Sequence, residues 1–180
     1  MSDHMFVVTG GPGSGKSSLI AALARRGVAA MPEAGRAIIR DQVRIGGRAL
    51  PWADRALFAE LMLAWDLRSH HEALARDGPV LMDRGIPDVA GYLTLCGLPV
   101  PAHVAAAAER HRYNARVFLA PHWEAIFTQD GERRQDRAEA AATARVMRET
   151  YSRLGYRLVD LPLAGIEDRA DFVAARLRGV

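Results

Sequence analysis

The segment Gly10-Gly11-Pro12-Gly13-Ser14-Gly15-Lys16-Ser17 decides the fold of this chain. It matches the phosphate-loop pattern G-x-x-x-x-G-K-[ST] at every position. The residues at 5–9 form an apolar run rich in β-branched side chains, which predicts a buried strand. Apolar residues at helical spacing over 17–26 predict a helix directly after the loop. Because strand, glycine-rich loop and helix in this order are the setting of a nucleotide-phosphate loop, we expect one here.

Each residue type in the segment has a chemical role in such a loop. Glycines let backbone N–H groups turn inward around a phosphate, and the helix that follows adds partial positive charge. Lys16 supplies a compact charge for the β- and γ-phosphates of ATP, which makes it a catalytic candidate, and Ser17 supplies a hydroxyl for Mg²⁺. The residues expected to bind the nucleotide are Gly11, Gly13, Ser14, Gly15, Lys16, Ser17 and Ser18.

The remainder of the chain alternates short apolar runs with helical patterns. Further strands are predicted at 28–31, 80–82, 116–120 and 157–161, and helices at 34–43, 54–76, 87–95, 102–112, 123–127, 137–154 and 169–177. Alternation of this kind predicts a parallel sheet with helices on both faces. With no repeat or linker in the sequence, we expect one α/β P-loop NTPase domain over 1–180, built as a three-layer sandwich.

An acidic residue follows the predicted strand at 80–82. Asp83 stands where a Walker B carboxylate orients Mg²⁺ or its water, so it is a candidate metal ligand and catalytic group. The carboxyl ends of parallel strands line one crevice, where Asp83 and the phosphate loop can meet. Arg84 comes next and would hold a phosphoryl group by a bidentate contact. The alternative is an ordinary turn-forming aspartate beside a surface arginine.

A second carboxylate, Glu33, comes directly after the predicted strand at 28–31 and Pro32. It could accept a proton from an attacking hydroxyl, as a catalytic base, or hold a substrate hydroxyl. It could equally be a helix-entry acid, since acids favour the first turn. Asp88 is a similar candidate that also suits a helix N-terminus after Pro87. The residues expected to bind the acceptor are Glu33, Arg36, Arg84 and Asp88.

A charged segment at 128–137 lies between two predicted helices. Small phosphoryl-transfer kinases close such a loop over the nucleotide, where its arginines neutralise the developing charge and exclude water. Arg133 and Arg137 are four residues apart and are the catalytic candidates, with Arg133 also a nucleotide contact. The alternative is a solvated, salt-bridged turn, and which arginine reaches the phosphate stays open.

Composition narrows the class of protein. The 180 residues carry 24 Lys+Arg against 21 Asp+Glu, and Lys16 is the only lysine. Nucleic-acid binding is not expected, because the arginines alternate with acids and form no long basic run. One cysteine allows no internal disulfide, and no apolar run or leader-like start indicates a membrane or secreted protein, so we expect a cytoplasmic location. The pair His70-His71 has no third metal ligand at suitable spacing and is expected at the surface.

Five segments together resemble a group of small predicted ATPases that stands beside the AAA-domain and ribosylnicotinamide kinase-like P-loop proteins. They are Gly10 to Ser17, Glu33-Ala34-Gly35-Arg36, Asp83-Arg84-Gly85-Ile86-Pro87-Asp88, Ile126-Phe127-Thr128 with Asp130-Gly131-Glu132-Arg133-Arg134-Gln135, and Tyr151-Ser152-Arg153-Leu154-Gly155-Tyr156. The resemblance implies a fold like that of nucleoside and nucleotide kinases, with sheet order 2-3-1-4-5. It implies no settled substrate. Thymidylate kinases usually carry an aromatic residue where this chain has Gly85, and the Glu-Arg-Ser segment of deoxynucleoside kinases is absent.

Two functions fit these observations. The first is a Mg²⁺-dependent kinase that transfers the γ-phosphate of ATP to a small hydroxyl-bearing metabolite such as a nucleoside or riboside. The second is a regulatory ATPase whose hydrolysis controls a protein partner. A guanine-specific switch would need an Asn-Lys-x-Asp motif, which a chain with a single lysine cannot contain, so ATP is favoured. A homodimer is compatible with either function.

Overall fold

The computed structural model describes residues 2–121, 123 and 137–177. Within them a parallel sheet of five strands has the order β2-β3-β1-β4-β5. The strands are β1 (Met5–Gly10), β2 (Ala29–Met31), β3 (Val80–Asp83), β4 (Arg116–Ala120) and β5 (Arg157–Asp160). The central strand β1 is fully buried, which explains why its sequence is a continuous apolar run.

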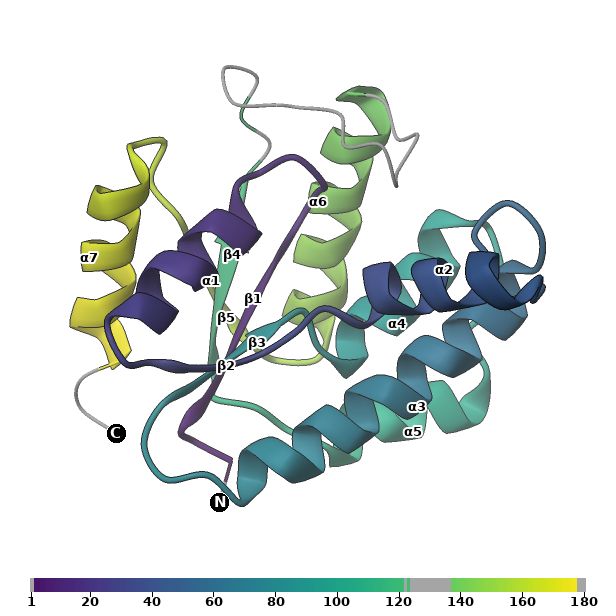
Figure 1. Ribbon diagram of the computed structural model, residues 1–180, viewed down its shortest axis with the longest axis horizontal. Coiled ribbons are helices and arrows are strands. Elements are labelled where there is room, and N and C mark those ends of the chain that lie inside the picture. Colours follow the sequence, from purple (N-terminus) through teal and green to yellow (C-terminus); the bar gives the residue numbers. More distant parts are fainter. Residues whose placement is uncertain (1, 122, 124–136, 178–180) are drawn as a thin grey trace.

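Helices cover both faces of this sheet (Figure 1). They are α1 (Lys16–Arg25), α2 (Ala34–Ile45), α3 (Arg55–Leu74), α4 (Ile86–Leu95), α5 (Ala102–Arg110), α6 (Arg137–Arg153) and α7 (Ile166–Leu177). Local chemistry sets several of their ends. The Asp54 carboxylate accepts a hydrogen bond from the Leu57 N–H at 3.0 Å and begins α3, and Gly46, with φ +70°, ends α2.

Alternating side chains of β1 build two separate cores. Phe6 and Val8 point to the face covered by α1 and α7, where they pack with Leu23 and Val173. Met5 and Val7 point to the opposite face, where the core includes Tyr151 of α6 and Ala73 of α3. Two further apolar clusters join α2, α3, α4 and α5 to one another beyond the edge of the sheet. This helical group extends to the side in Figure 1.

The structure confirms the predicted α/β class, the parallel five-stranded sheet and its order. The main elements lie within a few residues of their predicted bounds. The helix predicted at 123–127 and most of the charged segment at 128–137 lie outside the described residues. In the described part of the chain, no helix is both long and apolar enough to cross a membrane.

Candidate functional site

The phosphate loop joins the end of β1 to the start of α1, as its sequence predicts. Its first two glycines are packed against neighbouring backbone. A Cβ on Gly10 would overlap the carbonyl oxygen of Ala120 in β4, and a Cβ on Gly11 would overlap that of Ala140 in α6. Glycine is therefore required here because two other elements approach the loop closely.

Lys16 lies buried inside the loop. Its ammonium group donates hydrogen bonds to the Gly11 carbonyl at 2.6 Å, the Ser14 hydroxyl at 3.2 Å and the Gly10 carbonyl at 3.3 Å. The Ser14 hydroxyl in turn donates to the Gly11 carbonyl at 2.8 Å. These contacts hold a positive charge at the centre of the loop, whereas Ser17 and Ser18 are exposed in the first turn of α1.

Asp83 ends β3 and pairs in register with Val8 of β1, so it lies on the strand next to the phosphate loop. Its neighbour Arg84 has φ +72°, in the left-handed region that costs a non-glycine residue about 1–2 kcal/mol. The Arg84 N–H donates to the Val8 carbonyl at 3.0 Å, which fixes this strained turn to the central strand. Strain of this kind is concentrated at functional sites.

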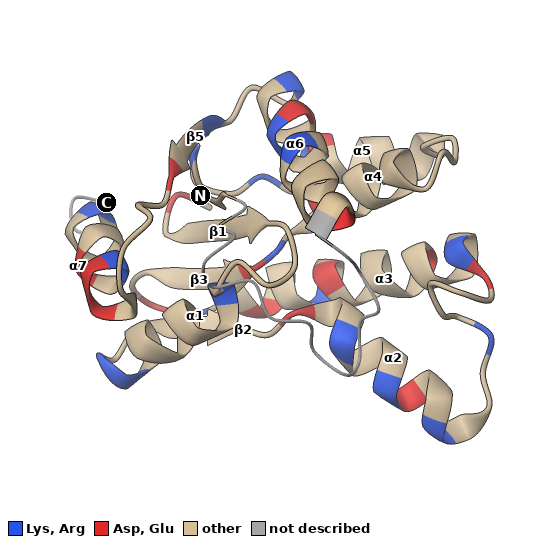
Figure 2. Ribbon diagram, turned by 90° about the horizontal axis from the view of Figure 1, so that it is seen from above, with Lys and Arg blue, Asp and Glu red and all other residues tan. Residues whose placement is uncertain are grey.

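The side chain of Arg84 connects two carboxylates from different elements. Its Nε donates to Glu33 Oε1 at 2.9 Å, and its Nη1 donates to Asp88 Oδ1 at 3.0 Å. Arg36 Nε lies 3.5 Å from the other Glu33 oxygen. The four residues predicted to bind the acceptor are thus brought together at the ends of β2 and β3. Figure 2 shows acidic and basic positions gathered between the sheet and helices α2 and α3.

Asp88 is held by more partners than its sequence position predicts. Besides Arg84, its carboxylate accepts hydrogen bonds from Thr9 Oγ1 at 2.6 Å, Tyr151 OH at 2.6 Å and the Gly85 N–H at 3.1 Å. The hydrogen bond from the Gly85 N–H is the contact expected of an acid at a helix N-terminus, the alternative role that the sequence leaves open for Asp88. This carboxylate therefore joins β1, α4 and α6, and it fixes the position of the Arg84 guanidinium.

Gly85 stands where thymidylate kinases carry an aromatic residue, and the structure gives the reason for glycine. A Cβ at this position would lie 3.1 Å from the ring of Tyr113, which leaves no room for a larger side chain. The Tyr113 hydroxyl also accepts a hydrogen bond from the Ile86 N–H at 3.2 Å. The ring of Tyr113, which precedes β4 in the chain, thus occupies the space beside the turn.

Asp66 of α3 lies close enough to the charges around Arg84 to interact with them, and this was not predicted from the sequence. The residue is only 7% exposed and forms no hydrogen bond or ion pair with another described residue. Burial raises its pKa well above the ordinary aspartate value; Asp88, Glu33 and Asp83 raise it further, while Arg84 lowers it. An aspartate in the buried stripe of α3, between Leu63 and His70, was the available signal.

The carboxylates around Arg84 stabilise its positive charge. Burial alone lowers the pKa of Arg84, but the carboxylates of Glu33, Asp88 and Asp83 outweigh it and leave the pKa above its ordinary value. Burial also raises the pKa of Tyr151, and its neighbour Asp88 raises it further. Arg84 is therefore a permanently charged centre, and Tyr151 a permanently neutral donor, at neutral pH.

Two predicted site residues lie partly or wholly outside the described residues. Arg133 lies outside the described residues, as does the rest of the segment 124–136. Arg137 begins α6, and its side chain also lies outside the description.

The histidine pair was only half correctly predicted. His71 is exposed, but His70 is buried, and its Nε2 is 2.9 Å from the Arg112 carbonyl oxygen. A third ring, His111, lies 5.2 Å from His70 and 5.6 Å from His71, centroid to centroid. Among described residues, no group of three histidine, cysteine or acidic side chains is arranged to hold a metal ion.

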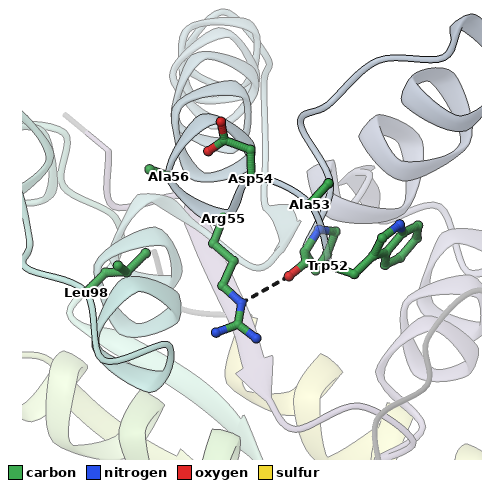
Figure 3. Close-up of a pocket in the computed structure, with 7 residues that line it drawn as sticks. Trp52, Ala53, Asp54, Arg55, Ala56 and Leu98 are labelled. Atoms are coloured by element: carbon green, nitrogen blue, oxygen red, sulfur yellow. Dashed lines mark hydrogen bonds between the residues drawn. The ribbon is translucent and has the colours of Figure 1, made fainter.

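A depression of about 350 Å³ lies at the start of α3, between the segment 51–56 and Leu98 (Figure 3). Its two charged residues have local structural roles. Asp54 caps α3, and the Arg55 Nε donates to the Pro51 carbonyl at 3.0 Å. Neither the phosphate loop nor the carboxylates around Arg84 contribute to its lining, so this depression is separate from the candidate site.

The phosphate loop on β1, the acid that ends β3 and the sheet order define a small P-loop, kinase-like protein. The profile of the AAA domain family matches residues 5–169, and the chain belongs to that family. The expected resemblance to this group of P-loop proteins is thereby confirmed. A search of curated proteins found no matching sequence.

Solved structures of similar fold include deoxyadenosine kinase from M. mycoides. The structure with the products dCMP and a flexible dCDP bound has a TM-score of 0.71 and 10% identity, covering 98% of this chain and all of that one. The structure with dATP bound has a TM-score of 0.66 and 9% identity, covering 97% of this chain and all of that one. At these identities, the likeness shows a shared nucleoside-kinase-like fold.

Proposed function

We propose that this protein is a Mg²⁺-dependent kinase that transfers the γ-phosphate of ATP to a hydroxyl group of a small metabolite, such as a nucleoside or riboside. The observation that carries the proposal is that the phosphate loop and the candidate acceptor residues lie at the same edge of the sheet. The phosphate loop follows β1, Glu33 follows β2, and Asp83 and Arg84 come at the end of β3. A donor phosphate and an acceptor hydroxyl could therefore meet at one edge of the sheet.

Lys16 and the backbone of the phosphate loop hold the donor end in this proposal. The ammonium group and the loop N–H groups surround the β- and γ-phosphates. The Ser17 hydroxyl and the Asp83 carboxylate are hard oxygen donors of the kind that Mg²⁺ prefers, so they would hold this ion. Bound there with ATP, Mg²⁺ neutralises charge on the phosphate oxygens.

Glu33 is the proposed base at the acceptor end. It is bonded to Arg84 at 2.9 Å and lies near Arg36, so its carboxylate is oriented by two positive charges. In that position it would take the proton of the attacking hydroxyl. Arg84, fixed by Asp88, would hold the transferred phosphoryl group or the acceptor. Arg133 and Arg137 remain the proposed arginines of the closing segment.

The test is a search for a phosphorylated product. The protein would be incubated with ATP, Mg²⁺ and a panel of ribonucleosides, deoxynucleosides including deoxyadenosine, other ribosides and simple alcohols, and the products followed by mass. We expect one class of acceptor to gain a phosphoryl group. If ADP and free phosphate accumulate without a phosphorylated acceptor, the kinase proposal is wrong and the regulatory ATPase is favoured.

Variants separate the two ends of the proposed site. Lys16→Ala should abolish ATP binding and turnover. Lys16→Arg should also be severely impaired, because the wide guanidinium does not fit the three contacts made by the ammonium group. Glu33→Gln should retain ATP binding and lose phosphoryl transfer. Near-normal transfer by Glu33→Gln would contradict the role of Glu33 as the base.

A further inference from the structure

A second buried arginine lies behind the phosphate loop. Arg169, in the first turn of α7, is only 2% exposed. Its Nη1 donates a hydrogen bond to the Ser14 carbonyl at 3.0 Å, although the two residues are 155 positions apart. The Arg169 Nε is buried without a hydrogen-bond partner, and no described carboxylate forms an ion pair with this side chain.

The surroundings of Arg169 differ from those of Arg84. Both side chains are buried, but three carboxylates raise the pKa of Arg84 above its ordinary value. Burial lowers the pKa of Arg169, and no acid among the described residues offsets this shift. An arginine removed from water without a counter-charge is costly to the fold. A negative group that is supplied with a ligand would offset that cost.

The hydrogen bond from Arg169 also fixes the direction of one peptide group. In a trans peptide the C=O and the following N–H point in opposite directions. Holding the Ser14 carbonyl toward α7 therefore turns the Gly15 N–H away from α7. Gly15 has φ +76° and lies directly before Lys16, so its N–H is one of the loop donors available to a phosphate.

The helix that carries Arg169 is a firm support. Arg169, Val173 and Leu177 are spaced four residues apart and lie on the buried face of α7. Val173 and Leu177 belong to the core between α1, α7 and the sheet. An arginine at a core-facing position of this stripe is the sequence signal for its role.

We propose that Arg169 is a positioning residue for polyphosphate binding. It acts through the Ser14–Gly15 peptide, and its unbalanced charge is compensated by the phosphates of the nucleotide. The inference rests on the proposed function, since it requires that the phosphate loop binds a nucleotide. It assigns Arg169 to the phosphate donor alone, so the acceptor should bind equally well without it.

The test compares three variants of the full chain. Arg169→Met keeps an unbranched apolar stem and removes the charge, while Arg169→Lys keeps the charge and loses the planar fork. Arg176→Met is the matched control, because Arg176 lies on the same helix and also donates to a carbonyl, that of Phe172 at 3.0 Å. Affinity for ATP, inorganic tripolyphosphate and adenosine is measured by calorimetry, and stability by urea unfolding without ligand.

We expect Arg169→Met to bind ATP and tripolyphosphate about 10- to 100-fold more weakly, the range for losing a charged hydrogen-bonding group. Its unfolding midpoint without ligand should equal or exceed that of the wild type, because a buried unpaired charge has been removed. Arg169→Lys should bind with intermediate affinity, and Arg176→Met like the wild type. Adenosine affinity, and KM for the acceptor once one is known, should not change.

Two results would overturn the inference while leaving the proposed function intact. One is unchanged tripolyphosphate affinity in both Arg169 variants when the wild type binds it. The other is a large loss of ligand-free stability in Arg169→Met with normal affinity in the molecules that remain folded, because this would show a purely structural role. If the wild type binds neither ATP nor tripolyphosphate, the proposed function fails first and the inference with it.

Discussion

Replacing Arg84 by methionine should destabilise the folded protein strongly. Arg84 donates to Glu33 at 2.9 Å and to Asp88 at 3.0 Å. The three side chains are 14%, 8% and 6% exposed, so water cannot take the place of the guanidinium. Methionine keeps most of the apolar stem and removes the charge, and the two carboxylates are left buried without it.

The magnitude follows from burial. Removing one partner of a buried ion pair costs about 3–5 kcal/mol, because the remaining charge is uncompensated. For a domain of this size, that loss corresponds to a fall in Tm of roughly 6–20 °C. The control is Arg68→Met. Arg68 and Glu72 have the same i,i+4 spacing as Arg84 and Asp88 and a contact of 2.7 Å, but Arg68 is 70% exposed. An exposed helical pair contributes about 0.3–0.5 kcal/mol.

The assay is urea unfolding of the wild type and both variants at pH 7.5 and pH 5.0. In Arg84→Met the uncompensated carboxylates should bind protons in the folded state at higher pH than in the unfolded state. The stability lost through the substitution should therefore shrink as the pH falls. Arg84→Lys, which keeps a charge, should lose less at pH 7.5 and serves if Arg84→Met does not fold.

Equal losses below about 1 kcal/mol for Arg84→Met and Arg68→Met at pH 7.5 would refute this reasoning. They would show that the carboxylates of Glu33 and Asp88 are adequately solvated, despite their burial. A large loss that does not change between pH 7.5 and pH 5.0 would refute the electrostatic part alone, since packing does not titrate.

Two further predictions concern pH. Because burial raises the pKa of Asp66, the folded state holds its proton at higher pH than the unfolded state, and stability is lost as pH rises above about 4. The free energy of unfolding of Asp66→Asn, measured with urea, should therefore rise relative to that of the wild type between pH 4.5 and pH 8. A difference between the two proteins that stays constant over this range would contradict the prediction. Burial lowers the pKa of His70, so folding stability should fall as pH drops below the ordinary histidine value of about 6.5. His70→Gln, which can still donate to the Arg112 carbonyl, should lose less folding stability than the wild type as the pH falls below 6.5. The control is His103→Gln, at an exposed site, which should not reduce this loss of stability.

Much of the fold follows from patterns that are local in the sequence. The phosphate loop is recognised from eight consecutive residues, and strands and helices follow from apolar periodicity over short windows. Asp83 and Glu33 could be assigned to one edge of the sheet because parallel strands bring their carboxyl ends together there. The approximate positions of the main site residues were predictable for this reason.

The connections between these residues depended on tertiary structure. Glu33 and Arg84 are 51 positions apart, and no local pattern specifies that Arg84 bonds this carboxylate rather than a phosphate or water. Burial has the same origin. Asp66 and Arg169 stand in the apolar stripes of α3 and α7, but no local pattern specifies that packing leaves them only 7% and 2% exposed. The sequence alone determined the class of protein and the phosphate loop, because both are encoded in short contiguous segments. Only the tertiary structure decided which charges are paired and which are left buried without a described counter-charge, because desolvation depends on contacts between segments that are distant in the chain.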